Sequence, residues 1–454
     1  MQEKLPFSNY FIIGVMLFAL FFGAGNLIFP AQLGQLAGDQ LWPSLIGFLI
    51  TGVGLPFLSV LAIGYSGSRN LLELSSRVHP VYGALFSSVL YLTIGPFFAG
   101  PRTGAVAYEI GIMPFVGEGA GAVPLFLFTL IFFAVTLWLS LNPAKIVDRI
   151  GKVLAPGIVV LLIVLIGIAV FKPMGALGEA SPAYAAEPFL NGFTEGYNTM
   201  DAIAALVFAI IVISAIKGMG VTTRKGILSA TFKAGLTAIS LLAILYIGIA
   251  WIGGTSVERF GLFETGGPVL SSAAEYYFGS LGTVLMAVVI TLACLTTAIG
   301  LISSCGEYFH TLIPAVGYKK WVVVFTVFSF VVANFGLSNI ITYSVPVLMF
   351  LYPLAISLLL LTFTSPLFNH ARLVYMAATA TAFVIGLVDG LSALAKSLET
   401  EFAWLEPVLS FFNEHLPLYE DGLGWVVPVV AVTVITAIIS RALGLSSKLE
   451  SAEA

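Results

Sequence analysis

The sequence predicts an all-α integral membrane protein with twelve transmembrane helices. Of its 454 residues, 59% are hydrophobic and only 9% are charged, whereas about 25% of the residues in a soluble domain are charged. The mean hydropathy is +1.04 over the whole chain. These values exclude a soluble globular protein. Because no long polar stretch interrupts the apolar ones, we expect one transmembrane domain over residues 1–454.

Twelve mostly apolar stretches are each long enough to cross the hydrocarbon core, which takes roughly 20 residues of helix. Runs such as residues 159–170 do not alternate apolar and polar side chains, so the spans are helices rather than barrel strands. The first span is too long for a signal peptide, and Pro30 interrupts it. The expected spans cover residues 8–36, 41–65, 80–101, 122–140, 150–171, 195–216, 227–252, 270–305, 319–336, 338–362, 371–392 and 423–443.

The charges between the spans predict the orientation in the membrane. If the N-terminus is cytoplasmic, only four of the 19 Lys and Arg residues fall on the outer side, namely Arg102, Lys172, Arg259 and Lys396. The other basic residues gather on the inner side, and acidic residues gather between the last two spans. This sorting follows the positive-inside rule. We therefore expect a multi-pass protein with cytoplasmic N- and C-termini.

The first span contains a predicted helix break. Gly23 and Gly25 each cost about 1 kcal/mol relative to alanine inside a helix. Pro30 lacks the N–H that would bond to the carbonyl of Asn26. Breaks persist at membrane depth only where they line a cavity or are buried in protein. A close-packing glycine face is the alternative, but the amide of Asn26 favours a cavity that binds a polar ligand.

Other polar residues within or beside the spans are candidates for coupling or gating. Asp201 lies in the polar start of the sixth span, at the edge of an otherwise apolar helix, where an ionisable group suggests function; a solvated acid that complements the helix dipole is equally compatible. Thr296 and Thr297 in the eighth span could ligate a small hard cation or bond back to their own helix. Arg102 and Glu109 lie on one face near the outer surface, as a gate or as an interfacial pair.

Three motifs resemble the bacterial branched-chain amino acid:cation symporter family, the BrnQ-type carriers. They are FGAGNLIFP at 22–30, GPFFAGPRT at 95–103 and YNTMDA at 197–202. The resemblance extends over essentially the whole chain. It implies a LeuT-type architecture, with two inverted five-helix repeats at about 8–171 and 195–362 and additional helices at about 371–443. It also implies a bacterial cytoplasmic membrane and symport of leucine, isoleucine and valine with Na⁺.

The resemblance further implies a Na⁺ site as the seat of ion coupling. The LeuT-type pattern places backbone carbonyls from the first and eighth helices together with two hydroxyls around the ion. Downstream of Asn26 this sequence is one residue shorter than that pattern, but upstream of it the register holds. The implied ligands are the carbonyls of Ala19, Phe22 and Ala293 and the hydroxyls of Thr296 and Thr297. Proton coupling through Asp201 is the alternative.

A branched-chain amino acid makes three demands on its site. Amides around residues 24–27 would face its carboxylate at a half-helix N-terminus, and freed carbonyls of the first and sixth spans would accept from its ammonium. Its side chain needs only an apolar wall, which distinguishes Leu, Ile and Val poorly because one methylene contributes about 1–3 kcal/mol. The candidate substrate-binding residues are Phe22, Gly23, Ala24, Gly25, Asn26, Tyr91, Ala204, Ala205 and Phe208.

Other classes of membrane protein fit less well. An enzyme would need a catalytic constellation, but the four histidines, His79, His310, His370 and His415, fall in separate loops. The sequence has no zinc-protease, serine-hydrolase or Walker motif. An ion channel is conceivable, although a broken first helix favours alternating access. The sequence has no cluster of basic residues of the kind that binds nucleic acid. We expect the partners to be the amino acid and membrane lipid, with no obligate protein partner.

Overall fold

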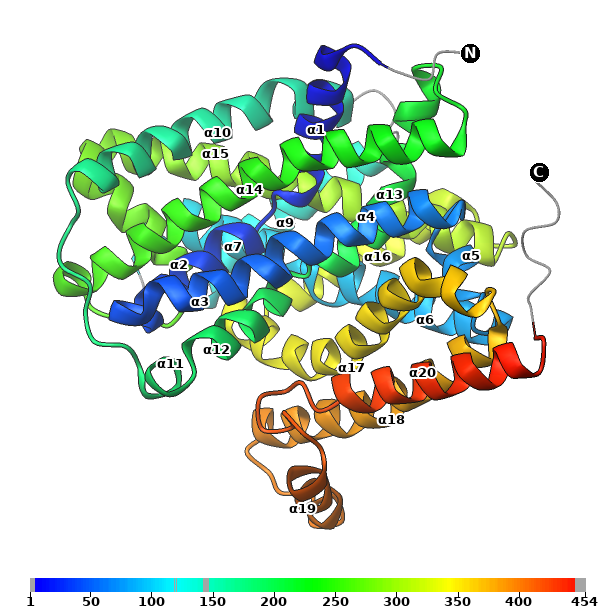
Figure 1. Cartoon of the computed structure of the whole chain (residues 1–454). Coiled ribbons are helices and arrows are strands. Elements are labelled where there is room, and N and C mark those ends of the chain that lie inside the picture. The colour runs from blue at the N-terminus through cyan, green and yellow to red at the C-terminus, as the bar shows by residue number, and fades with distance from the viewer. Residues whose placement is uncertain (1–4, 118, 120, 142–146, 446–454) are drawn as a thin grey trace.

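The computed structural model describes residues 5–117, 119, 121–141 and 147–445, without the side chains of 147–156. Over this part of the chain the regular structure is entirely helical, and the helices pack into one bundle (Figure 1). The α-helices are α1 (Phe7–Phe21), α2 (Gly25–Ala37), α3 (Leu41–Leu49), α4 (Leu55–Ser66), α5 (Leu71–Ser75), α6 (Pro80–Leu92), α7 (Ala99–Gly111), α8 (Met113–Val116), α9 (Ala122–Ser140), α10 (Val147–Phe171), α11 (Pro182–Ala186), α12 (Pro188–Glu195), α13 (Asp201–Gly218), α14 (Arg224–Phe260), α15 (Gly267–Leu312), α16 (Tyr318–Ala333), α17 (Leu337–Thr364), α18 (Arg372–Ser397), α19 (Glu406–His415) and α20 (Val426–Ala442).

Among the described residues, 8 helical stretches are long and apolar enough to cross a membrane. Three shorter apolar helices, Phe7–Phe21, Gly157–Phe171 and Val426–Ala442, accompany them. The chain is therefore multi-pass, while the number of twelve crossings stays a prediction. So does the orientation. Of the basic residues that support it, Lys4, Lys145 and Lys448 lie outside the described residues, as do the side chains of Arg149 and Lys152.

The predicted break in the first span is confirmed. Helix α1 ends at Phe21 and α2 begins at Gly25, and Phe22 between them has an extended backbone with φ −72° and ψ 98°. Pro30 lies inside α2 without ending it. Because proline has no backbone N–H, α2 lacks only the hydrogen bond to the Asn26 carbonyl, which lies in the first turn of the helix. The break therefore lies in the glycine segment rather than at the proline.

The segment predicted to begin the sixth span is broken as well. Helix α12 ends at Glu195 and the 3₁₀ turn Gly196–Thr199 follows, while the apolar helix long enough to cross a membrane begins at Asp201. Between the turn and α13, Met200 adopts the left-handed conformation, with φ 62° and ψ 8°. For a residue with a Cβ this conformation costs about 1–3 kcal/mol and persists only where the surroundings hold it. The break is directly beside Asp201.

The third span is longer than predicted. It was expected to end at residue 101, but the π-helical turn Thr93–Phe97 leads into α7, which continues to Gly111. Pro101 does not stop the helix because it lies in the first turn of α7, where backbone N–H groups have no helical partner. As a consequence, Arg102 is near the start of a helix and not at the end of a span.

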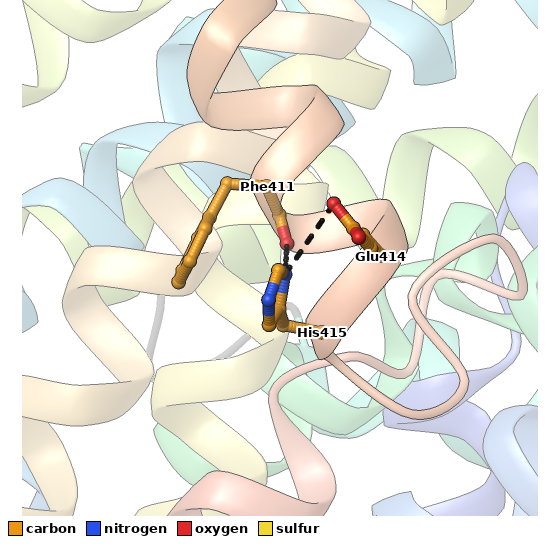
Figure 2. A network of polar contacts seen from close by, with 3 residues as sticks. All are labelled: Phe411, Glu414 and His415. Atoms are coloured by element: carbon orange, nitrogen blue, oxygen red, sulfur yellow. Dashed lines mark hydrogen bonds and ion pairs between the residues drawn. The ribbon is translucent and has the colours of Figure 1, made fainter.

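Helices α17, α18 and α20 pack together at one edge of the bundle, and α19 projects from it (Figure 1). The acidic segment between the last two predicted spans thus includes a helix that was not expected. In α19 the ring of His415 stacks on Phe411 with centroids 4.4 Å apart and lies 3.9 Å from the carboxylate of Glu414 (Figure 2). This histidine is exposed on a projecting helix, remote from both breaks.

Candidate binding site at two helix breaks

The two helix breaks touch each other through their backbones. A Cβ atom on Gly25 would lie 3.1 Å from the carbonyl oxygen of Thr199, one residue before Met200. That separation is tighter than nearly all real Cβ contacts, so the approach depends on glycine at this position. Residues about 175 positions apart therefore form one site.

A buried polar cluster joins the breaks to α14. The Asn26 Nδ2 amide donates to Asp201 Oδ2 at 2.6 Å, and the Tyr246 hydroxyl donates to the same oxygen at 2.5 Å. Asn26 Nδ2 also donates to the Tyr246 oxygen, and Asn26 Oδ1 accepts the N–H of Gly23 at 2.7 Å. Only 3% of Asp201 is exposed. The interpretation of Asp201 as a solvated helix-terminal acid is therefore wrong.

Arg102 is buried in the centre of the protein rather than near the outer surface. Its Nη1 donates to the carbonyl of Asn198 at 2.7 Å and its Nη2 to Ser344 Oγ at 3.1 Å, and the guanidinium lies over the ring of Phe29. Only 1% of the residue is exposed, and its Nε has no hydrogen-bond partner. The prediction of a surface position is wrong because α7 extends ten residues past Pro101.

Arg102 and Glu109 do not form the interfacial pair that their spacing allows. Glu109 Oε1 accepts the hydroxyl hydrogen of Thr265 at 2.6 Å, just before α15. A small cavity of about 210 Å³ lies beside it and is also lined by Glu264 and Asn339. Glu109 thus connects α7 to the start of α15, separately from the contacts of Arg102.

The structure brings together part of the implied cation site. Thr297 Oγ1 lies 3.5 Å from the carbonyl oxygen of Phe22, so α15 meets the first break. The N–H of Gly23 bonds to Asn26 and not to Ala19, which frees the Ala19 carbonyl from the helical ladder. Thr296 Oγ1 donates to the Ala293 carbonyl at 2.7 Å, the back-bond of its own helix. Ion binding by these groups stays a prediction.

Most of the candidate substrate residues surround the breaks, but Tyr91 does not. Phe22 and Ala24 are buried in the first break. In the first turns of α13, Ala205 and Phe208 are buried and Ala204 is partly buried. The ring of Tyr91 instead stacks on Tyr308, with centroids 4.1 Å apart. Tyr308 is about 16 Å from Thr297 along α15 at 1.5 Å per residue. Tyr91 thus packs against the later part of α15, and its part in substrate binding stays a prediction.

Two contributors to the site were missed at the level of sequence. Tyr246 stands alone in an apolar stretch of α14, where a hydroxyl at membrane depth was the only available signal. Ser344 lies in the largely apolar helix α17, and its hydroxyl oxygen accepts from Arg102. Neither residue can be paired from spacing alone, because Tyr246 is 220 positions from Asn26 and 45 from Asp201, and Ser344 is 242 positions from Arg102.

Comparisons with known proteins agree on one family. Residues 7–443 match the family model described as branched-chain amino acid transport protein. The chain is 47% identical over 440 residues to the branched-chain amino acid permease BrnQ of Bacillus subtilis (strain 168), covering 97% of this chain and 98% of that protein. It is 38% identical over 444 residues to BrnQ of Escherichia coli (strain K12), covering 98% of each.

Solved structures show the same fold at low sequence identity. An inward-facing conformation of Mhp1 matches with a TM-score of 0.57 and 14% identity, covering 97% of this chain and 93% of that one. MhsT in complex with L-phenylalanine matches with a TM-score of 0.53 and 17% identity, covering 94% and 98%. The fold is therefore of the LeuT type.

Proposed function

Because the chain belongs to the family of branched-chain amino acid transport proteins, a family of transporters and not enzymes, we propose that it is a secondary active symporter. It imports leucine, isoleucine and valine across the bacterial cytoplasmic membrane together with Na⁺. The relatives named above are permeases for branched-chain amino acids, which supports the substrate class. The buried, facing helix breaks supply the freed backbone groups that such a substrate needs.

The proposed architecture has twelve crossings in one transport domain, residues 1–454, with both termini cytoplasmic. Two inverted repeats, at about 8–171 and 195–362, each begin with a broken helix, and the helices at about 371–443 lie outside them. The breaks at residues 22–24 and at Met200 support this arrangement, since each falls in the first span of its repeat. So does the LeuT-type fold of the similar structures.

One contact carries the proposal of Na⁺ coupling, that between Thr297 Oγ1 and the Phe22 carbonyl oxygen at 3.5 Å. Two oxygens that ligate one cation at about 2.4 Å lie about 3.4 Å apart when they are at right angles. In this proposal the carbonyls of Ala19 and Ala293 and the hydroxyl of Thr296 complete the shell. The hydroxyl oxygen of Thr296 must then face the ion while its hydrogen still donates to the Ala293 carbonyl of the same helix. The ion joins the first helix to the eighth.

The polar cluster around Asp201 supports a second candidate, proton coupling. Asp201 is a buried carboxylate whose side chain accepts hydrogen bonds from the neutral groups of Asn26 and Tyr246. No ion pair to it is formed within the part of the chain that the structure describes. A proton that enters or leaves this carboxylate would change the charge exactly where the two breaks meet. The two candidates differ in the gradient that drives uptake.

Uptake into proteoliposomes separates the candidates. Purified protein is reconstituted, and radiolabelled leucine is added under an inward Na⁺ gradient, an inward proton gradient or neither. Accumulation above equilibrium that requires the Na⁺ gradient supports the first candidate. Accumulation driven by the proton gradient without Na⁺ supports the second, and equilibration with neither gradient contradicts symport.

A further inference from the structure

The sixth-helix break holds two buried side chains of opposite charge, Arg102 and Asp201, that do not pair with each other, and a third ionisable group, Glu195, accepts from the Asn198 amide at 3.2 Å without forming an ion pair to Arg102. Arg102 donates to the carbonyl of Asn198, and Asp201 follows three residues later on the same short segment. Only 1% of Arg102 and 3% of Asp201 are exposed. The described residues contain no ion pair for either side chain. Each charge has been removed from water without an opposite charge at contact distance.

Such an arrangement is costly unless something else completes it. The effective penalty for burying one ion is several kcal/mol, and neutral hydrogen-bond partners offset only part of it. Arg102 has two neutral acceptors, but its Nε donor is buried and unpartnered. Asp201 Oδ2 has two neutral donors. A ligand with one anionic and one cationic group would supply each side chain with a partner of opposite charge at contact distance.

The position of the guanidinium connects it to the first break as well. It lies 4.9 Å from the centre of the Phe29 ring, and that ring is 3.4 Å from the place a Cβ on Gly25 would occupy. Arg102 is thus held against the first turns of α2 and against the sixth-helix break. Asp201, through Asn26, is held against the same two segments.

We propose that Arg102 and Asp201 are the two charged anchors of the substrate site, with Arg102 binding the carboxylate and Asp201 the ammonium of a zwitterionic amino acid. This inference rests on the proposed function and names the groups that recognise the substrate backbone. The planar guanidinium suits a carboxylate because it offers several donors in one plane. Both charges are then used by the common part of every amino acid, and the side chain meets only apolar walls.

Ligands that lack one charge test the assignment. Leucine, leucinamide and 4-methylpentanoate share a side chain, but leucinamide has no carboxylate and 4-methylpentanoate has no ammonium. Apparent affinity is measured in Na⁺ from the rise of the thermal unfolding midpoint of purified protein with ligand concentration. For the wild type we expect leucine to bind at least roughly 30-fold more tightly than either analogue, because each analogue leaves a buried charge unpaired.

The variants divide the two roles. Arg102→Gln should weaken leucine by roughly 30-fold or more and leave leucinamide nearly unchanged, so the preference between them collapses. Arg102→Lys keeps the charge and should retain the preference. Asp201→Asn should weaken leucine and leucinamide and spare 4-methylpentanoate. As a matched control, Arg372→Gln removes a guanidinium that donates to the Val78 carbonyl away from the site, and it should leave all three affinities unchanged.

A purely structural role for Arg102 gives a different pattern. Arg102→Gln would then weaken the binding of leucine and of leucinamide by the same factor, and Arg102→Lys would not restore the preference for leucine. Either result overturns the inference. If Arg102→Gln is not recovered in the membrane, Arg102→Lys decides, since loss of its preference for leucine over leucinamide also overturns it. A wild type that neither binds nor transports leucine contradicts the proposed function instead.

Discussion

At the residue scale, one amide determines how the two breaks meet. Asn26 accepts the N–H of Gly23 with its oxygen and donates with its nitrogen to Asp201 and Tyr246. Its side chain therefore closes the first break and ties it to α13 and α14. Buried polar groups are costly when a partner is lost, because the remaining group cannot turn to water. The cluster is a sensitive point of the fold.

Tyr246→Phe should destabilise the protein. The change removes a hydroxyl that donates to Asp201 and accepts from Asn26, at an expected cost of about 1–3 kcal/mol. Thermal unfolding of the purified variant in detergent should show a clearly lower midpoint. Tyr352→Phe is the matched control, because Tyr352 is equally buried and its hydroxyl has no hydrogen-bond partner. Equal midpoints for the two variants would contradict the cluster.

Thr297→Val should raise the half-saturating Na⁺ concentration of leucine uptake about tenfold. Valine keeps the volume and removes the oxygen that faces Phe22, and loss of one buried polar partner costs about 1–3 kcal/mol, where 1.4 kcal/mol is tenfold. Thr297→Ser keeps the oxygen and should change the value little. An unchanged Na⁺ dependence in Thr297→Val would remove this residue from the ion site and make Asp201 the leading coupling residue.

At the element scale, the helix break that depends on local residue types was predicted from the sequence, whereas the break and the buried arginine that depend on contacts between distant residues were not. Gly23 and Gly25 identify the break in the first span, and the structure has it there, whereas Pro30 does not interrupt α2. The break at Met200 has no such signal, because methionine disfavours the left-handed conformation it adopts. That conformation is held by neighbours from other helices, including Arg102 on the Asn198 carbonyl. The burial of Arg102 was missed for the same reason.

Gly25→Leu should abolish transport while the protein still reaches the membrane. A Cβ at this position would lie 3.1 Å from the Thr199 carbonyl, so a larger side chain must separate the two breaks. Leucine uptake per amount of membrane protein measures the effect. Gly300→Leu is the control, since a Cβ at Gly300 in α15 has nothing within 4 Å. Normal uptake by Gly25→Leu would show that the breaks need not touch.

At the scale of the whole molecule, the exposed surface is apolar where a soluble protein would be polar. Trp138 is 71% exposed, Phe171 87% and Ile438 63%, which fits a perimeter covered by lipid. Composition alone predicts an integral membrane protein, because so few charged residues among 454 cannot cover the surface of a soluble one. The orientation follows from the sorting of charges and is open to direct measurement.

Thiol labelling should find α19 outside the cell and the first turn of α16 inside. The native Cys294 and Cys305 are both fully buried, so the wild type should give a low background. His415→Cys and Lys319→Cys each introduce an exposed thiol on a helix end. A membrane-impermeant maleimide should label His415→Cys in intact cells and Lys319→Cys only after permeabilisation. The reverse pattern would place the termini outside.

Leucine, isoleucine and valine should compete with one another for uptake, and lysine and glutamate should not. The buried charges at the breaks balance one ammonium and one carboxylate, so the extra charge of a lysine or glutamate side chain would be buried without a partner at a cost of several kcal/mol. One methylene contributes only about 1–3 kcal/mol, so the three branched side chains should differ modestly. Inhibition of radiolabelled leucine uptake by each unlabelled amino acid provides the measurement. Inhibition by lysine at concentrations comparable to those of isoleucine would show that the pocket holds another counter-charge. Selection of the substrate could then not be attributed to the apolar wall formed by Phe22, Ala205 and Phe208.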